Sequence, residues 1–163
     1  MYGVRGYFKR SKDWILVSTS LNSQKHILER ILFKHKNSHT YLLADAYNGK
    51  YIKQTTIGFL EANAGNNALK LIHNKKELCF GVDAQLLGYV GHDGLMEFEV
   101  EGDFNAIDNK KRDAIILACI SKNYFSSYLK QTKSNPLVWT TGLMAPEAYT
   151  LKASIDGWIL NET

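Results

Sequence analysis

Short, uniformly apolar runs recur along this chain and are separated by polar or amphipathic stretches. Runs of about four or five apolar residues are typical of strands that are buried on both faces of a sheet. Such runs occupy Trp14–Val17, Tyr41–Ala44, Leu86–Val90, Ala114–Ala118 and Leu137–Thr140. The pattern predicts an α/β fold, a three-layer α/β/α sandwich around a mainly parallel sheet of about five to six strands.

The stretches between these runs carry the spacing of amphipathic helices. The first helix is expected after a cap at Asn22 or Ser23, with apolar members Ile27, Leu28, Ile31 and Leu32. Three more helices are expected over residues 51–64, 124–131 and 146–160. Pro146 suits the first position of the last helix, because an N–H there would have no intrahelical partner.

Two stretches interrupt the alternation of apolar runs and helices. Residues 67–85 hold two weak apolar runs, which predict an edge strand or a short helix. Residues 96–105 alternate with a period of two, which predicts a small strand or hairpin projecting from the sheet. No internal repeat and no linker rich in Pro, Gly and Ser divides the sequence. We therefore expect a single α/β domain over residues 1–163.

Composition and charge narrow the range of partners. Apolar residues make up 45% and charged residues 22% of the chain, close to the average for globular proteins. The net charge of +4 is scattered along the sequence, so nucleic acid is not an expected partner. No apolar segment reaches the ~20 residues of a membrane-spanning helix, so no membrane is expected either. The first ten residues lack the apolar core of a secretory signal.

The only two cysteines, Cys79 and Cys119, are too few for a disulfide framework or a four-ligand zinc site. A reducing, cytoplasmic setting fits this cysteine content best. No set of His, Cys, Asp and Glu has metal-ligand spacing, and no glycine-rich phosphate loop follows a predicted strand. We therefore expect neither a metal nor a cofactor.

Chemistry is expected beyond the carboxyl ends of the strands, where ligands of open parallel sheets collect. Two successive predicted strands end at His92 and at Cys119. Neighbouring strands lie about 4.8 Å apart, so side chains at equal heights come within reach of each other. A free thiol has a pKa near 8.5, and an adjacent imidazole can stabilise its thiolate or transfer a proton. The pair therefore predicts a nucleophilic cysteine with a histidine acid/base, and Cys79 is interpreted as structural.

Backbone groups around the pair complete this interpretation. Gly91 and Gly94 flank His92 and permit a tight turn and a close approach of substrate. The N–H groups that follow Cys119, and those of Asp93 or Gly94, are candidates to face a developing oxyanion.

The segment Gly91-His92-Asp93-Gly94 after one apolar strand, and Leu117-Ala118-Cys119-Ile120-Ser121 after the next, resembles the caspase–hemoglobinase fold of cysteine peptidases. That group includes caspases, legumains, gingipains and the CHAT-domain peptidases. Its members carry a catalytic histidine at the end of one strand and a catalytic cysteine, often after alanine, at the end of another. The resemblance implies a caspase-like sandwich in which His92 and Cys119 are catalytic.

Further residues at predicted strand ends are candidates for substrate binding. They are Asp45, Gly91, Asp93, Gly94, Ser121, Thr140 and Thr141. Asp45 could orient His92 or accept a basic substrate side chain, or it could cap the turn at Asn48 and Gly49. Asp93 could accept a hydrogen bond from the turn backbone. The two threonines could bind substrate backbone, or could turn the chain into the last helix.

The leading hypothesis is a cysteine hydrolase that acts on peptide or protein substrates through a His92–Cys119 dyad. An alternative is a catalytically inactive α/β binding or regulatory module of the same fold, which the insertion of Asp93 before Gly94 and the short chain favour. A third is a flavodoxin-like binder of small molecules, which would bind at the strand ends without this pair. The sequence leaves the oligomeric state and the cleavage preference open.

Overall fold

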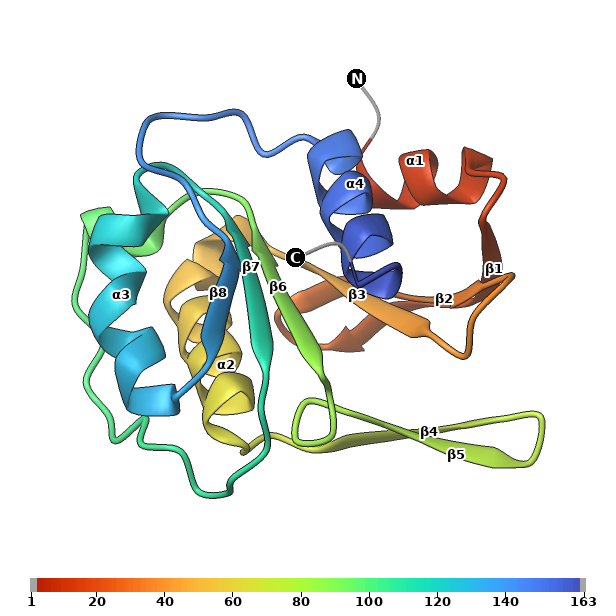
Figure 1. Cartoon of the computed structure of the whole chain (residues 1–163), viewed down its shortest axis with the longest axis horizontal. Helices are drawn as coiled ribbons and strands as arrows, with labels where there is room; N and C mark the ends of the chain where they lie inside the picture. Colours follow the sequence, from red (N-terminus) through yellow and green to blue (C-terminus); the bar gives the residue numbers. More distant parts are fainter. Residues whose placement is uncertain (1–2, 162–163) are drawn as a thin grey trace. The chain divides into compact units, whose positions relative to one another are not determined.

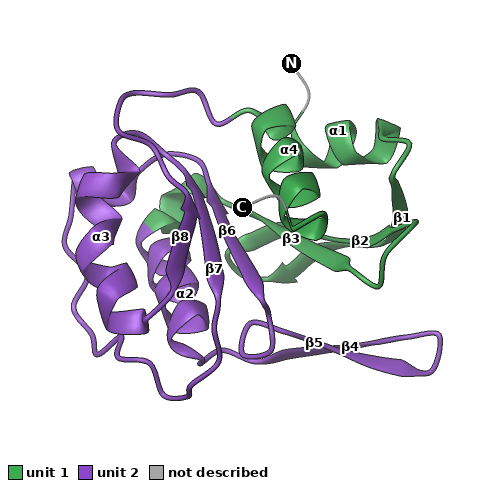
Figure 2. Cartoon of the chain, in the orientation of Figure 1, with its two compact units in different colours: residues 1–52, 147–163 green, residues 53–146 purple. Residues whose placement is uncertain are grey.

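The computed structural model describes residues 3–161, which form a mixed α/β structure (Figure 1). They divide into two compact units (Figure 2). Unit 1 comprises the described parts of residues 1–52 and 147–163, and unit 2 comprises residues 53–146. The expectation of a single domain over the whole chain stays a prediction. None of the helices in the described residues is long and apolar enough to span a bilayer.

Unit 1 is built on an antiparallel sheet with the strand order β1-β2-β3. Its strands are β1 (Trp14–Gln24), β2 (Ile27–His35) and β3 (Tyr41–Tyr47). Two helices, α1 (Val4–Arg10) and α4 (Ala148–Ile159), belong to the same unit, and a short 3-10 helix, η1 (Gly49–Tyr51), follows β3. The ring of Phe8 packs against those of Trp14 and Phe33, with centroids 5.5 and 5.7 Å away. These buried rings anchor α1 on the sheet.

Unit 2 contains a parallel sheet with the strand order β6-β7-β8. Its strands are β6 (Leu86–Val90), β7 (Asp113–Leu117) and β8 (Asn135–Val138). Two helices, α2 (Ile52–Ala64) and α3 (Ser121–Thr132), lie alongside this sheet (Figure 1). A separate antiparallel hairpin of β4 (Leu69–His73) and β5 (Lys76–Phe80) extends away from it.

The core of unit 2 joins one face of the parallel sheet to both helices. Phe59 from α2 and Phe125 from α3 meet Tyr89 of β6, with ring centroids 5.3 to 5.9 Å apart. Ala114 and Ile116 of β7 belong to the same buried cluster. Ile115 and Leu117, which alternate with them, are also buried, so β7 is covered on both faces. This burial explains why β7 is the most uniformly apolar stretch of the sequence.

The prediction of parallel strands is confirmed for the second half of the chain and wrong for the first, and of the three parallel strands β7 is the one that is buried along most of its length. β6, β7 and β8 form the parallel sheet, and α2, α3 and α4 overlap the predicted helices. The first two apolar runs, however, belong to β1 and β3 of an antiparallel sheet, so the parallel sheet has three strands and not five to six.

Three smaller expectations are also corrected. The predicted first helix is the strand β2, whose backbone pairs on both sides with β1 and β3. Ile27 and Ile31 fit a period of two as well as the helical spacing, Phe33 fits only the period of two, and the two ladders decide for the strand. Residues 97–105 form no strand, and only the short 3-10 helix η2 (Gly94–Met96) precedes them. Pro146 lies before α4, whose cap is Glu147.

A buried guanidinium ties the loops around the amino ends of β6 and β7. The Arg112 side chain is 1% exposed. It donates to both carboxylate oxygens of Asp108 at 2.8 Å and to the carbonyl of Val82 at 2.6 Å. The hydrogen bonds from Arg112 lower the pKa of Asp108 to about 2.

We predict that Arg112→Met lowers the free energy of unfolding by about 3 kcal/mol, because it leaves a carboxylate and a carbonyl without their buried donor. Urea unfolding followed by circular dichroism measures this. Lys111→Met, at the exposed neighbouring position, is the control and should stay within about 0.5 kcal/mol. Equal urea midpoints for Arg112→Met and Lys111→Met would contradict a stabilising role for the Arg112 hydrogen bonds.

The same pair predicts a dependence of stability on acid. The pKa of Asp108 is lower in the folded chain, about 2, than its ordinary value of 3.8. The ion pair is therefore fully stabilising above pH ~4 and loses its contribution as the pH falls toward ~2. The stability difference between wild type and Asp108→Asn should shrink over this interval in urea titrations at successive pH values. A difference that stays constant down to pH ~2 would show that Arg112 does not bind the ionised carboxylate.

Candidate functional site

The parallel pairing of β6 and β7 brings two chemistry-bearing residues to one edge of the sheet. The pairs run in register from Leu86 with Asp113 to Val90 with Leu117. One further bond, from the amide of Gly91 to the carbonyl of Leu117 at 3.1 Å, continues the ladder. His92 and Cys119 each stand two residues beyond the last pair, so they leave neighbouring strands at equal heights.

The His92 segment is held by its own turn. Gly91 has a φ of 154°, which favours glycine and ends the strand. The Tyr89 hydroxyl donates to the carbonyl of His92 at 2.8 Å. The imidazole itself is 54% exposed, and its Nε2 lies 2.8 Å from Oε1 of Glu97. The histidine is therefore open to solvent but oriented by a carboxylate.

Cys119 follows β7 and is partly buried. Its Sγ lies 3.5 Å from both the backbone N–H and the carbonyl oxygen of Met144. The next residue, Ile120, has a φ of 50° and a ψ of 29°, a left-handed conformation that costs a β-branched residue about 1–3 kcal/mol. The chain thus turns sharply between the thiol and the first residue of α3.

A compact hydrogen-bond network fixes this turn. Ser121 is fully buried, and its hydroxyl donates to the carbonyl of Ile116 at 3.0 Å and accepts from the amide of Thr140, also at 3.0 Å. In return the amide of Ser121 donates to Oγ1 of Thr140 at 3.1 Å. The amide of Ile120 donates to the carbonyl of Gly142 at 2.9 Å. These bonds join the start of α3 to the segment that follows β8.

The network corrects the expected anion site after Cys119. The amides of Ile120, Ser121 and Lys122 all donate to residues 140–142. They therefore hold the fold together and do not face a substrate oxygen. Asp93 is also fully buried, so its amide is not exposed to a ligand.

The predicted substrate-binding residues fall into three groups. Asp45 does not end a strand of the parallel sheet: it lies inside β3 of unit 1 and binds Arg30 in two bonds of 2.6 and 2.7 Å. Ser121, Asp93 and Gly94 are buried, and Ser121 positions the turn. Gly91 and Thr140 are partly exposed, and Thr141, which follows Thr140, is exposed.

Asp93 caps η2 and does not extend into solvent. Its Oδ1 accepts from the amide of Leu95 at 3.0 Å, and its Oδ2 has no hydrogen-bond partner in the described part of the chain. Burial raises the pKa of this carboxyl. The residue that separates His92 from Gly94 is therefore an internal support of the turn, as the expected bond to the turn backbone predicts.

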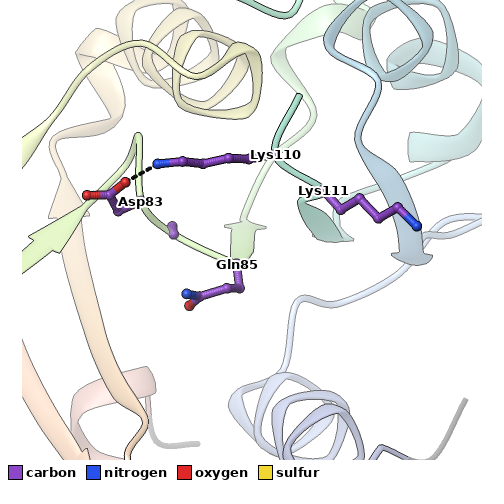
Figure 3. Close-up of a pocket in the computed structure, with 5 residues that line it drawn as sticks. Asp83, Gln85, Lys110 and Lys111 are labelled. Carbon is purple, nitrogen blue, oxygen red and sulfur yellow. Dashed lines mark hydrogen bonds and ion pairs between the residues drawn. The ribbon is translucent and has the colours of Figure 1, made fainter. Parts of the chain in front are cut away.

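The other thiol lies in a different environment. A hydrogen bond with Asp83, and then burial, raise the pKa of Cys79, which disfavours its thiolate. Asp83 also lines a cavity of about 400 Å³ with Gln85, Lys110 and Lys111 (Figure 3). Lys110 pairs with Asp83 in this cavity, whereas Lys111 points away from it. Because Gln85 and Lys111 precede the parallel strands β6 and β7, the cavity lies at the end opposite to His92 and Cys119.

Two contacts of the site carry no signal in the sequence. Glu97 reaches His92 across a 3-10 turn, and Met144 reaches Cys119 from 25 positions further along the chain.

Within residues 3–161, no three His, Cys, Asp or Glu side chains are grouped to hold a metal ion. No protein-family model, curated protein or solved structure matches this chain.

We predict that Ser121→Ala lowers the free energy of unfolding by about 1–3 kcal/mol, because the amide of Thr140 loses its acceptor. Ser127→Ala is the matched control: it removes the same hydroxyl from an exposed position of α3 and should change stability by less than about 0.5 kcal/mol. Thermal and urea unfolding measure both. If the two variants are equally stable, the network does not hold the turn.

Proposed function

We propose that this chain is a cysteine hydrolase acting on peptide bonds, with Cys119 as nucleophile and His92 as general acid and base. The observation that carries the proposal is the equal offset of the two residues beyond the paired strands β6 and β7. In this proposal unit 2 is a reduced caspase-like domain, with three parallel strands and with α2 and α3 against one face.

The proposed reaction follows from the two side chains. His92 accepts the thiol proton, the sulfur of Cys119 bonds to the scissile carbonyl carbon, and the C–N bond breaks as the imidazolium protonates the leaving amine. Water then attacks the thioester, with His92 accepting its proton. The acid product leaves, and the proton returns to the sulfur. Each step conserves protons and needs no metal or cofactor.

The surroundings of the two cysteine sulfurs differ, and they favour Cys119 over Cys79 as the nucleophile. The backbone N–H of Met144 donates to Sγ of Cys119 at 3.5 Å. At Cys79 a hydrogen bond with Asp83, and then burial, raise the pKa of the thiol, which disfavours its thiolate. An electrophile should therefore discriminate between the two cysteines.

One contact favours the second candidate, an inactive binding module. The thiol of Cys119 also donates to the carbonyl of Met144 at 3.5 Å, and a thiol that keeps its proton in such a bond is not a nucleophile. The amides that follow Cys119 also favour the inactive module, because they already donate hydrogen bonds within the chain. The two candidates differ in whether the thiol reacts.

We predict that a peptidyl acyloxymethyl ketone labels the wild-type chain at Cys119. Cys119→Ala should abolish this labelling while changing stability by less than about 1 kcal/mol. His92→Ala should slow it by at least about 100-fold, because the proton acceptor is lost. Mass spectrometry of the labelled chain, together with hydrolysis of a peptide panel, measures both effects.

Cys79→Ala is the matched control and should be labelled at the wild-type rate. Equal labelling of Cys119→Ala and wild type would reject Cys119 as the nucleophile. An unlabelled wild type that cleaves no peptide of the panel would support the inactive module instead.

A further inference from the structure

We infer that Glu97 is a positioning residue for His92, which holds a hydrogen on Nε2 and leaves Nδ1 as the nitrogen that exchanges a proton with Cys119. The inference rests on the proposed function, because it names the third member of the same site. Its basis is the 2.8 Å contact between Nε2 of His92 and Oε1 of Glu97.

The contact determines which nitrogen carries the hydrogen. A carboxylate can only accept hydrogen bonds, so Nε2 must donate in this pair. In the neutral ring the remaining nitrogen, Nδ1, then has the free lone pair. Hydrolases commonly activate a nucleophile with an adjacent base, and a third group orients that base through a hydrogen bond.

The local fold places Glu97 where it can do this. Asp93 caps η2 through the amide of Leu95, and the amide of Glu97 donates to the carbonyl of Gly94 at 2.9 Å. This turn brings the side chain five residues after His92 back to the ring. Asp93 and Leu95 are buried, so packing in the interior holds this turn in place.

The backbone of His92 is also fixed, by the bond from the Tyr89 hydroxyl to its carbonyl. The remaining freedom is rotation of the imidazole, and Glu97 is the group that restricts it. The carboxyl group next to the ring in sequence, Asp93, bonds to the amide of Leu95 instead. Glu97 therefore orients the histidine, and the candidate that the sequence offered for this role, Asp45, binds Arg30 instead.

A merely structural ion pair and a positioning residue differ in their consequences. The side chains of His92 and Glu97 are 54% and 65% exposed, and pairs this exposed add little to stability. A structural role therefore predicts that removing Glu97 changes almost nothing. A positioning role predicts a change in the ring and in turnover without a change in the melting temperature.

The experiment uses the full chain with Glu97→Ala, and with Glu97→Gln as the conservative variant, because the glutamine oxygen can accept the same hydrogen bond. Glu99→Ala is the control, since it removes an exposed glutamate two positions away. Long-range ¹H–¹⁵N spectra at alkaline pH report which nitrogen of His92 carries the hydrogen. Peptide hydrolysis gives kcat and KM separately.

We expect His92 to carry its hydrogen on Nε2 in the wild type and in Glu99→Ala, and to populate both tautomers in Glu97→Ala. For the same variant we expect kcat to fall about 10- to 100-fold with KM within about twofold, and Glu97→Gln to recover most of the loss. A single, unchanged tautomer in Glu97→Ala would overturn the inference even if the chain hydrolyses peptides. A changed tautomer in a chain that cleaves nothing would overturn the proposed function and keep the orienting role of Glu97.

Discussion

The register of β6 against β7 is the constraint on which the candidate site depends. Val90 pairs with Leu117, and the strand ends after them are therefore at equal heights. A slip of one residue would shift the end of β7 along the end of β6, so that Cys119 and His92 would no longer leave the sheet at equal heights. The packing of Tyr89 between Phe59 and Phe125 holds β6 against both helices. These ring contacts hold the strand against which β7, the strand before the thiol, is paired.

The sequence predicts the parallel sheet of unit 2 well because its strands are short apolar runs, and β7 in particular is buried on both faces. Leu86–Val90 and Asp113–Leu117 are nearly uninterrupted apolar runs, and the helix α3 that follows has a clear apolar stripe. In unit 1 the same reasoning fails for a physical reason. β1 and β3 begin as apolar runs but continue as longer strands, and β2 combines helical spacing with alternation. Only the hydrogen bonds to both neighbours select the strand, and they are not local properties of the sequence.

The residues of the candidate site also divide into those that the sequence predicts and those that depend on tertiary contacts. The strand-end rule identifies His92 and Cys119 because each residue follows an apolar run directly. It does not identify Glu97 or Met144, whose contacts depend on a 3-10 turn and on the path of the chain after β8. Nor does it anticipate Ile120 in a left-handed conformation, since a β-branched residue is among the least suited to it. Such a residue is kept there by tertiary bonds and not by its own preference.

Those tertiary bonds connect the strain at Ile120 to the chemistry of the thiol. The segment from Thr140 to Gly142 accepts the amides at the start of α3, and Met144 contacts the sulfur two residues later. The same short stretch therefore holds the turn and sets the electrostatic surroundings of Cys119. In the observed arrangement it offers the sulfur a donor and an acceptor from one residue, so a small displacement of Met144 would change which of them the thiol meets. The surroundings of the Cys119 sulfur are thus set by the loop after β8 as much as by the strand that presents the cysteine.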